Sequence, residues 1–309
     1  AGSFLGGRMT LDPGRARRAI DEKVARPLGL SIGEAALGMH AIVNENMANA
    51  ARIHTVERGH DPAAYTLVAF GGAGPVHAYG VARRLGIKRI IVPQSAGVGS
   101  ALGLHLAPRS YHLARTVIGT LQGLDWSAVE RAYAEMTREA VDVLKDAGVK
   151  RRDISFIRIA DMRYAGQRKE LAVALPTGRL STRKAAAIRR AFEDSYERVY
   201  RRIHDGHDVE TLTWRLVAEG PPIVNAAELH HAPQNDSRRA LTGRRPMQFE
   251  GWSKARDCAV YDRRLLAPGR RVRGPAAIEE TESTIIVGPD AQAVVDDYGN
   301  IVIELTSKG

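Results

Sequence analysis

The sequence predicts an α/β protein in three parts: an α/β lobe, an α+β domain and a small C-terminal β-rich domain. Two observations predict this class. The first third alternates apolar strand-like runs with amphipathic helical patterns around a glycine-rich turn, and the later segments change to mixed helices and strands and then to short strands. We therefore expect domains at residues 1–115, 116–220 and 246–309, joined by a polar linker at residues 221–245.

The composition indicates a folded protein with a basic surface. Of the 309 residues, 44% are hydrophobic, which is enough for a sizeable core. Lysine and arginine exceed aspartate and glutamate by 45 − 35 = 10, but they are dispersed in short pairs, and only 6% of residues are aromatic. Base-stacking surfaces need aromatic side chains, so we expect no nucleic-acid partner. The charge suits anionic ligands or an acidic partner subunit instead.

The cysteine, histidine and hydropathy patterns limit which metal or disulfide sites the chain can form and where in the cell we expect it. Cys258 is the single cysteine, which excludes an intrachain disulfide and a cysteine-rich zinc site. The pair His230–His231 lies in the linker and has no evident third ligand, so we expect no metal site. No apolar run approaches the ~20 residues of a membrane span, and the N-terminus lacks a signal-peptide pattern. We expect a cytoplasmic protein with no membrane partner.

Capping residues mark two helix starts. Asp12 followed by Pro13 predicts a helix that runs to about residue 24. Ser31 with Glu34 forms a capping-box pattern that opens the longest helical pattern, residues 31–59.

The helix at 31–59 has an apolar and a polar side. The apolar side favours close helix packing, with the wall of a cleft as the alternative; its residues are Ile32, Ala35, Ala36, Met39, Ile42, Val43, Met47, Ala50, Ile53 and Val56. The polar side holds Asn44, Glu45, Asn46, Asn49 and Arg52. Asparagine is a poor helix former, and solvent exposure explains it simply. A polar site face, with Asn46 or Arg52 turned toward a ligand, is the other hypothesis.

The chain is organised around a strand, a glycine turn and a helix. Residues 67–70 read as a short buried strand, and Pro75 suits the first turn of the helix that follows. The turn between them consists of Gly71, Gly72, Ala73 and Gly74. Glycine lets the backbone turn sharply or approach a bound group closely.

This turn has two interpretations. Its glycines can serve turn geometry alone, or the helix N-terminus can offer N–H groups to a phosphate or another polar ligand. The spacing matches neither the dinucleotide-binding G-x-G-x-x-G pattern nor the P-loop. His77, one turn further on, is either a site residue or a packing residue.

A second small-residue segment follows. Residues 89–93 predict another buried strand, and residues 95–104 are mostly small. The segment is either a second loop beside the glycine turn, with Ser100 lining the site, or a helix start packed on a neighbouring element.

The remaining chain supplies the other two predicted domains. In the α+β domain we expect helices at 126–147 and 181–204 and strands at 154–162, 171–175 and 212–218. In the β-rich domain we expect strands at 247–249, 259–261, 276–278, 284–287, 293–295 and 301–305, with Gly299 in a turn.

Five stretches resemble the A subunit of the hydantoinase/5-oxoprolinase family. Residues 56–62 and 67–78 carry the strongest likeness, and residues 4–9, 161–167 and 274–280 are similar to its other landmarks. The resemblance covers nearly the whole chain and extends to related acetone and acetophenone carboxylase subunits.

The resemblance implies a fold and a site. It implies a partial lobe of the actin/sugar-kinase/Hsp70-like ATPase type, in which two lobes close around ATP. Gly71, Gly72 and Gly74 would then place their backbone against the adenosine side of the nucleotide, with Ala73 between them. The D-x-G-x-T phosphate motif of such ATPases is absent from the chain. We therefore expect a fragment, or one product of a split gene, that resembles the C-terminal half of the subunit.

The implied activity is ATP-dependent hydrolysis of cyclic amides, of the hydantoinase or 5-oxoprolinase type, with ATP and Mg²⁺ as cofactors. The implied partners are the N-terminal half of the A subunit, a B-type hydantoinase subunit and a small cyclic amide substrate. A subunit of an acetone- or acetophenone-type carboxylase is one alternative. A non-catalytic scaffold that is inactive alone is the other. Catalytic residues are not identifiable from the sequence.

Overall fold

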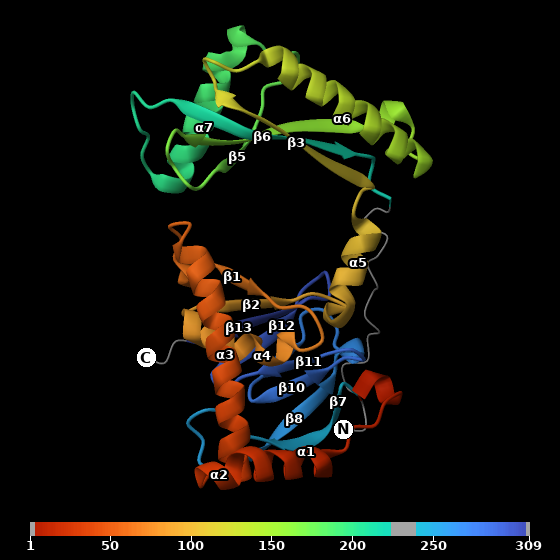
Figure 1. Ribbon diagram of the computed structural model, residues 1–309. Helices are drawn as coiled ribbons and strands as arrows, with labels where there is room; N and C mark the ends of the chain where they lie inside the picture. The colour runs from red at the N-terminus through yellow and green to blue at the C-terminus, as the bar shows by residue number, and fades with distance from the viewer. Residues whose placement is uncertain (1–3, 224–238, 307–309) are drawn as a thin grey trace. The chain divides into compact units, whose positions relative to one another are not determined.

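The computed structural model describes residues 4–223 and 239–306, which form two compact units (Figure 1). Unit 1 combines described residues from the segments 1–104 and 227–309, and unit 2 lies within residues 105–226.

Unit 1 begins with helices whose ends follow their capping residues. The side chain of Asp12 accepts a hydrogen bond from the Arg15 N–H, and both bonds of the capping box between Ser31 and Glu34 are present, as predicted. The helical segments of the unit are η1 Phe4–Gly7, α1 Pro13–Ile20, a π-helical segment Asp21–Ala25, α2 Arg26–Leu28, α3 Ile32–Val56, η3 Pro62–Ala64, α4 Gly74–Leu85, η4 Ala96–Val98, α5 Gly99–Leu106 and η8 Arg263–Leu265.

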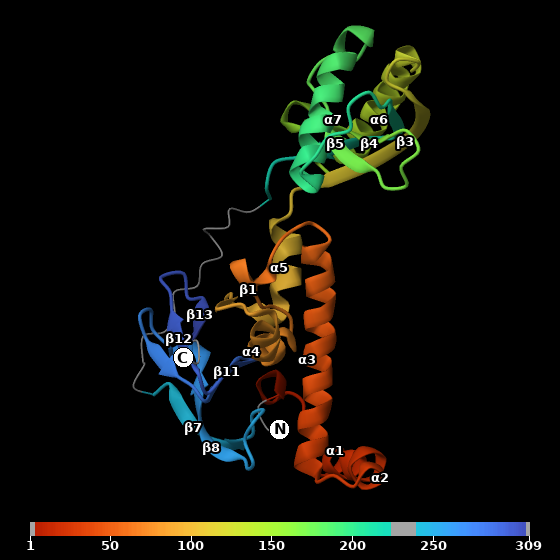
Figure 2. The same ribbon diagram turned by 90° about the vertical axis from the view of Figure 1, so that its left-hand side faces the viewer.

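Unit 1 contains two sheets. The first has the order β1-β2-β13-β12-β9, with β1 parallel to β2 and the remaining neighbours antiparallel; its strands are β1 Thr66–Val68, β2 Arg89–Val92, β13 Ile301–Leu305, β12 Ala291–Val295 and β9 Arg271–Arg273. The second has the order β11-β10-β8-β7, with strands β11 Thr284–Val287, β10 Ala276–Glu279, β8 Arg256–Asp262 and β7 Leu241–Met247. Helix α4 packs on β2 and β11. Helix α3 packs on α4 (Figure 2).

The C-terminal strands complete the N-terminal sheet, so the structure departs from the predicted separate domains at 1–115 and 246–309. Ile90 of β2 stands opposite Ile303 of β13, and both side chains are fully buried. They belong to one hydrophobic core that joins α4, β2 and the strands from β10 to β13. Neither segment buries its apolar strands alone, because each supplies only part of the sheet. Of the predicted linker 221–245, residues 224–238, including His230 and His231, lie outside the described residues, and its last residues begin β7.

Helix α3 faces the opposite way from the prediction. Asn44, which we expected either in solvent or on a polar site face, is fully buried, as is Ala48 one turn later. Most of the predicted packing side is exposed instead, with Ile42 at 63% and Ile53 at 60% of their maximal exposure, whereas Ala35 near the start of the helix is buried. The reason is that α4 packs on the small and polar side of α3, which leaves Ile42 and Ile53 on the apolar side exposed.

Strand β1 is also more open than predicted. We expected residues 67–70 to be a buried strand, but β1 lies at the edge of its sheet, and Val68 and Phe70 are 53% and 55% exposed. Only Ala69 is buried. An edge strand exposes one row of backbone N–H and C=O groups. Its side chains are exposed as well where no other element packs on them.

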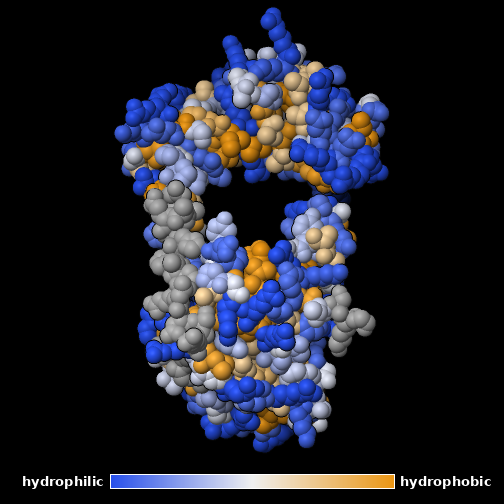
Figure 3. All heavy atoms as spheres, turned by 180° about the vertical axis from the view of Figure 1, so that it is seen from behind, coloured by the Kyte–Doolittle hydropathy of each residue, from blue (hydrophilic) through white to orange (hydrophobic). Residues whose placement is uncertain are grey.

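Unit 2 is an α+β domain close to the one predicted. Its antiparallel sheet has the order β3-β6-β4-β5, and helices α6 and α7 pack on it (Figure 1). One core contains Tyr133 and Met136 of α6, Phe192 of α7 and Trp214 of the sheet. The elements are β3 Ser110–Thr120, α6 Trp126–Asp146, β4 Ser155–Tyr164, β5 Leu171–Ala174, α7 Ala185–Tyr200 and β6 Val209–Glu219. Figure 3 shows one face of each unit, where apolar side chains lie in patches among charged ones.

None of the helices in residues 4–223 and 239–306 is both long enough and apolar enough to cross a bilayer. Cys258 is buried in β8, and burial raises the pKa of its thiol, as expected for a structural rather than a reactive cysteine.

Candidate functional site

The glycine turn forms a bare bend of backbone at the start of α4. Gly71 has φ +86°, a left-handed conformation that favours glycine, and its N–H donates to the Ala96 carbonyl at 2.6 Å. Ala73 precedes α4 without a side-chain cap, and Pro75 occupies the first turn. The first N–H groups of a helix have no partner within the helix, so this end of α4 presents donors.

Two distant segments close around this bend. Residues 95–99 lie beside it, and the loop after β10 reaches both: a Cβ on Gly72 would be 3.3 Å from the Glu282 carbonyl oxygen, and one on Gly97 would be 2.9 Å from the same atom. That loop is held by Ser283, which donates to Glu280 at 2.6 Å. Tertiary folding therefore brings together the glycine turn, the second small-residue segment and residues 280–283.

The turn has room for a ligand that approaches its backbone. A Cβ placed on Gly71 or Gly74 would meet no atom within 4 Å. Gly74 also has an ordinary backbone conformation, so neither packing nor strain within the described structure requires glycine there. A phosphate or another polar group fits this combination of open space and helix N-terminus.

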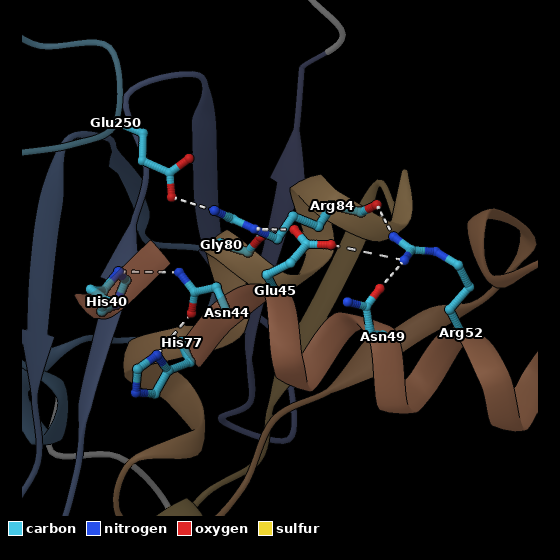
Figure 4. Close-up of polar contacts among 9 residues, drawn as sticks. All are labelled: His40, Asn44, Glu45, Asn49, Arg52, His77, Gly80, Arg84 and Glu250. Atoms are coloured by element: carbon cyan, nitrogen blue, oxygen red, sulfur yellow. Dashed lines mark hydrogen bonds and ion pairs between the residues drawn. The ribbon is translucent and has the colours of Figure 1, made fainter. Parts of the chain in front are cut away.

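A buried amide links α3 to the start of α4 (Figure 4). Asn44 Oδ1 accepts a hydrogen bond from His77 Nδ1 at 2.8 Å, and Asn44 Nδ2 donates to His40 Nδ1 at 3.1 Å. The two imidazoles stack with centroids 4.8 Å apart. The amide oxygen of Asn44 can only accept and its nitrogen can only donate. In this arrangement the Nδ1 atom of His77 therefore carries a proton and the Nδ1 atom of His40 does not.

A second network holds α3 against the C-terminal end of α4. Arg84 contacts Glu45 at 3.1 Å and Glu250 at 2.7 Å (Figure 4). Arg52 donates to the Arg84 carbonyl at 3.1 Å and also bonds to Asn49. These contacts tie both helices to the segment after β7.

A cavity of about 1030 Å³ lies beside these networks, between α3, α4 and residues 245–252. Its wall includes His40, Tyr79, Phe249 and Trp252, and Arg84 and Glu250 meet at it. The glycine turn does not line this cavity.

Burial shifts two titratable groups of the cavity. Burial is the largest cause that lowers the pKa of His40, with His77 and Arg84 acting in the same direction and Glu250 opposing them. Burial, and then a hydrogen bond to Asp290, raises the pKa of Tyr79 to about 12. Both side chains are therefore neutral at pH 7.

The predicted site residues have different surroundings. Asn46 and Ser100 are exposed. Arg52 is occupied in joining α3 to α4, and His77 points to Asn44. Asn44 was missed as a site residue because its position on the polar side of α3 resembles solvent exposure.

Within the described part of the chain, no three side chains of histidine, cysteine, aspartate or glutamate are grouped as a metal ion would require.

Comparison with known proteins identifies the family. A family model described as hydantoinase/oxoprolinase matches residues 1–112, and a model of the hydantoinase/oxoprolinase C-terminal domain matches residues 124–305. The chain belongs to the hydantoinase/oxoprolinase family. Its glycine turn lies in the first matched segment, and residues 280–283 lie in the second.

Relatives of this hydantoinase/oxoprolinase chain are longer proteins. An uncharacterized protein of Methanocaldococcus jannaschii is 33% identical over 97% of the chain and 42% of its own length. Caprolactamase subunit alpha of Pseudomonas jessenii and acetone carboxylase beta subunit of Xanthobacter autotrophicus are each 29% identical, over 96% of the chain and 43% of their own lengths. The chain thus spans less than half the length of these relatives.

Two solved structures share the mixed α/β fold. ATP-dependent caprolactamase from Pseudomonas jessenii matches 99% of the chain and 45% of its own chain, with a TM-score of 0.75 and 27% identity. Nucleotide-free acetone carboxylase matches 99% of the chain and 44% of its own, with a TM-score of 0.73 and 25% identity.

Proposed function

We propose that this chain is the C-terminal part of an ATP-dependent hydrolase of cyclic amides, and that its glycine turn contacts the adenosine side of ATP. It acts as part of an assembly and is not an active enzyme alone. The proposal includes the fold assignment: unit 1 holds a partial ATPase lobe of the actin/sugar-kinase/Hsp70 type.

The observation that carries the nucleotide proposal is the open backbone at Gly74. In a well-packed turn a glycine is needed where a Cβ would clash or where φ is positive. Neither condition holds at Gly74, whereas Gly71, three residues earlier, has a positive φ and equally open space. Close approach of a bound group is a physical reason for glycine at such a position. The positive end of α4 favours a ligand that carries phosphates.

This chain and its partner polypeptides contribute different parts of the proposed active site. Bound ATP would supply the phosphoryl group that activates the amide oxygen and makes the ring carbonyl susceptible to water. This chain positions the nucleotide through Gly71, Gly72, Ala73 and Gly74, and Asn44 and His77 hold the helix that starts there. Phosphoryl transfer also needs a positioned phosphate chain and Mg²⁺. The rest of an A-type subunit supplies those contacts, and a B-type subunit completes the hydrolytic site.

A carboxylase is the second candidate. The likeness to an acetone carboxylase beta subunit, at 29% identity, equals the likeness to caprolactamase subunit alpha. Both relatives are more than twice as long as this chain. The part that they share with it fits a common role in nucleotide binding, and the acceptor of the phosphoryl group is then bound by the rest of each enzyme. A scaffold without nucleotide contacts is the third candidate, and nucleotide titration separates it from the other two.

Isothermal titration with ATP and Mg²⁺ tests the proposal. We expect no binding by the chain alone and binding after the upstream part of the A-type subunit is added. Gly74→Ala should weaken ATP binding in the assembly at least tenfold, because the new methyl group occupies the approach to the backbone. Gly72→Val should abolish it.

Gly243→Ala is the matched control, because a Cβ there also meets nothing within 4 Å and Gly243 lies in β7. It should leave ATP affinity unchanged. Circular dichroism and thermal unfolding should show that both alanine variants fold like the parent. Unaltered affinity in Gly74→Ala would remove the turn from the nucleotide site. Turnover by the isolated chain would contradict the division of labour.

A further inference from the structure

The face of α3 that points away from α4 has the spacing of a docking seam. Asn44 and Ala48 face α4, and half a turn away lies a row with alternating steps of three and four residues. This row, called the α3 seam below, consists of Met39, Ile42, Asn46, Asn49, Ile53 and Val56. Steps of three and four keep side chains on one face along the whole length of a helix.

The α3 seam is exposed along its whole length. Ile42 and Ile53 show more than half of their surface, and Met39 and Val56 are also exposed. Single apolar residues on a surface need no explanation, but apolar residues at both ends of a row about five turns long indicate an interaction surface. Asn46 and Asn49 divide the seam into two apolar ends with a polar middle.

The neighbouring sheet is incomplete on the same unit. β1 is an edge strand that runs parallel to β2, and Val68 at its end and Phe70 just after it are more than half exposed. Parallel strands normally have both faces covered, and exposed edges invite pairing with further strands. Among its described residues, unit 1 therefore leaves two kinds of surface uncovered, a helix face and a sheet edge.

The relatives of this chain contain further polypeptide that is a candidate occupant of these surfaces. The chain spans only 42% to 45% of each relative described above, so in each relative the additional polypeptide is longer than the part that matches this chain. We propose that the α3 seam is the docking surface for the upstream part of an A-type subunit. This rests on the proposed function, in which that part completes the nucleotide site.

The seam defines the chemistry of its partner. The partner surface is apolar at both ends, to bury Met39 and Ile42 on one side and Ile53 and Val56 on the other. At its middle it carries an amide or hydroxyl group, because buried asparagine side chains must be hydrogen-bonded. A polar group at one level of an apolar seam also fixes the register of the two surfaces.

A second copy of the chain is the competing occupant. In an antiparallel pair of α3 helices, Asn46 would face Asn49 of the other copy and Ile42 would face Ile53, so the seam is self-complementary. That arrangement covers α3 alone, whereas one upstream polypeptide of the length found in the relatives can cover both α3 and the edge at β1. The experiment separates the two.

The test is sedimentation velocity with the upstream part of the A-type subunit produced as a separate polypeptide. The chain alone should sediment as a monomer, and the mixture should form a 1:1 complex. Ile42→Glu and Ile53→Glu should each raise the Kd of that complex at least tenfold, since each buries a carboxylate in an apolar surface. Both positions are exposed, so both variants should keep the thermal midpoint of the isolated chain.

Ile118→Glu is the matched control, because Ile118 is an exposed isoleucine of unit 2. It should change the Kd less than twofold. An unchanged Kd of the complex in both seam variants would overturn the inference. A dimer of the chain alone that dissociates in Ile42→Glu would overturn it as well.

ATP binding by the complex and its dependence on the seam are two separate readouts. A seam-dependent complex that binds no ATP would contradict the nucleotide role and leave the docking surface intact. A complex that binds ATP and has the same Kd in the seam variants as in the parent would contradict the docking surface alone.

Discussion

Asn44 and His77, 33 positions apart in sequence, share a hydrogen bond of 2.8 Å that joins the middle of α3 to the first turn of α4. Asn44 is fully buried at this contact. The glycine turn ends one turn before His77, so the amide fixes the direction in which α4 leaves the turn.

Loss of this amide should destabilise the chain. Asn44→Ala removes the hydrogen bonds to His77 and His40 and leaves two part-buried imidazole groups without their partner, so we expect a loss of about 1–3 kcal/mol in unfolding free energy. Urea denaturation followed by circular dichroism measures it. Asn46→Ala, at an exposed position of the same helix, should change the isolated chain by less than about 0.5 kcal/mol. Equal effects of the two variants would contradict the buried linkage.

Gly80→Ala should be destabilising although alanine is the better helix former. A Cβ at Gly80 would lie 2.8 Å from Asn44 Cγ, so α3 and α4 would have to separate. In an open helix position the same change stabilises by roughly 0.5–1 kcal/mol, and Gly38→Ala on α3, where a Cβ meets nothing within 4 Å, should do so. Thermal midpoints should therefore move in opposite directions. A rise in both would show that the helices are not in close contact at Gly80.

His40 should make stability depend on pH in the acid range. Its pKa is lowered in the folded chain from the ordinary value of 6.5, so below pH 6.5 the unfolded chain binds the proton more readily than the folded chain. The stabilisation is fully present above pH 6.5 and is lost as the pH falls through the lower folded pKa.

We expect the unfolding free energy of the parent to fall more between pH 7.5 and 5.5 than that of His40→Gln, measured by urea denaturation at each pH. His54→Gln, at an exposed position on α3, should retain the slope of the parent. A parent slope unchanged by His40→Gln would assign the pH dependence to other groups.

The buried pair Arg263–Glu280 should be costly to break. The two side chains are 7% and 10% exposed, and Arg263 also donates to the carbonyls of Val92 and Gly299 at 2.9 Å each. Glu280→Gln leaves a buried guanidinium without its counter-charge, so we expect a loss of about 3–5 kcal/mol. Arg264→Ala, which removes a side chain that is 75% exposed and paired with Asp262, should cost at most about 1 kcal/mol. Chemical denaturation of both variants tests this difference.

The elements that the sequence predicted well depend on near neighbours. The caps at Asp12 and Ser31, the glycine turn and helix α6 all appear where their local patterns place them. Strands β3 and β9 were not predicted as such, because neither has an uninterrupted apolar run, and their pairing partners lie far away in the chain.

The sequence by itself determined the capped helices, the glycine-rich bend and the α+β class of unit 2, because these features depend mostly on residues that are close together in the chain. Its motifs also indicated the family. Only the tertiary structure decided that the last strands complete the first sheet, that Asn44 is buried while Ile42 and Ile53 are exposed, and that residues 280–283 lie against the glycine turn. The physical reason is that periodicity shows which side of a helix or strand is apolar, whereas burial depends on which surfaces meet. Those meetings join positions that are often more than 200 residues apart, as in the pairing of Ile90 with Ile303.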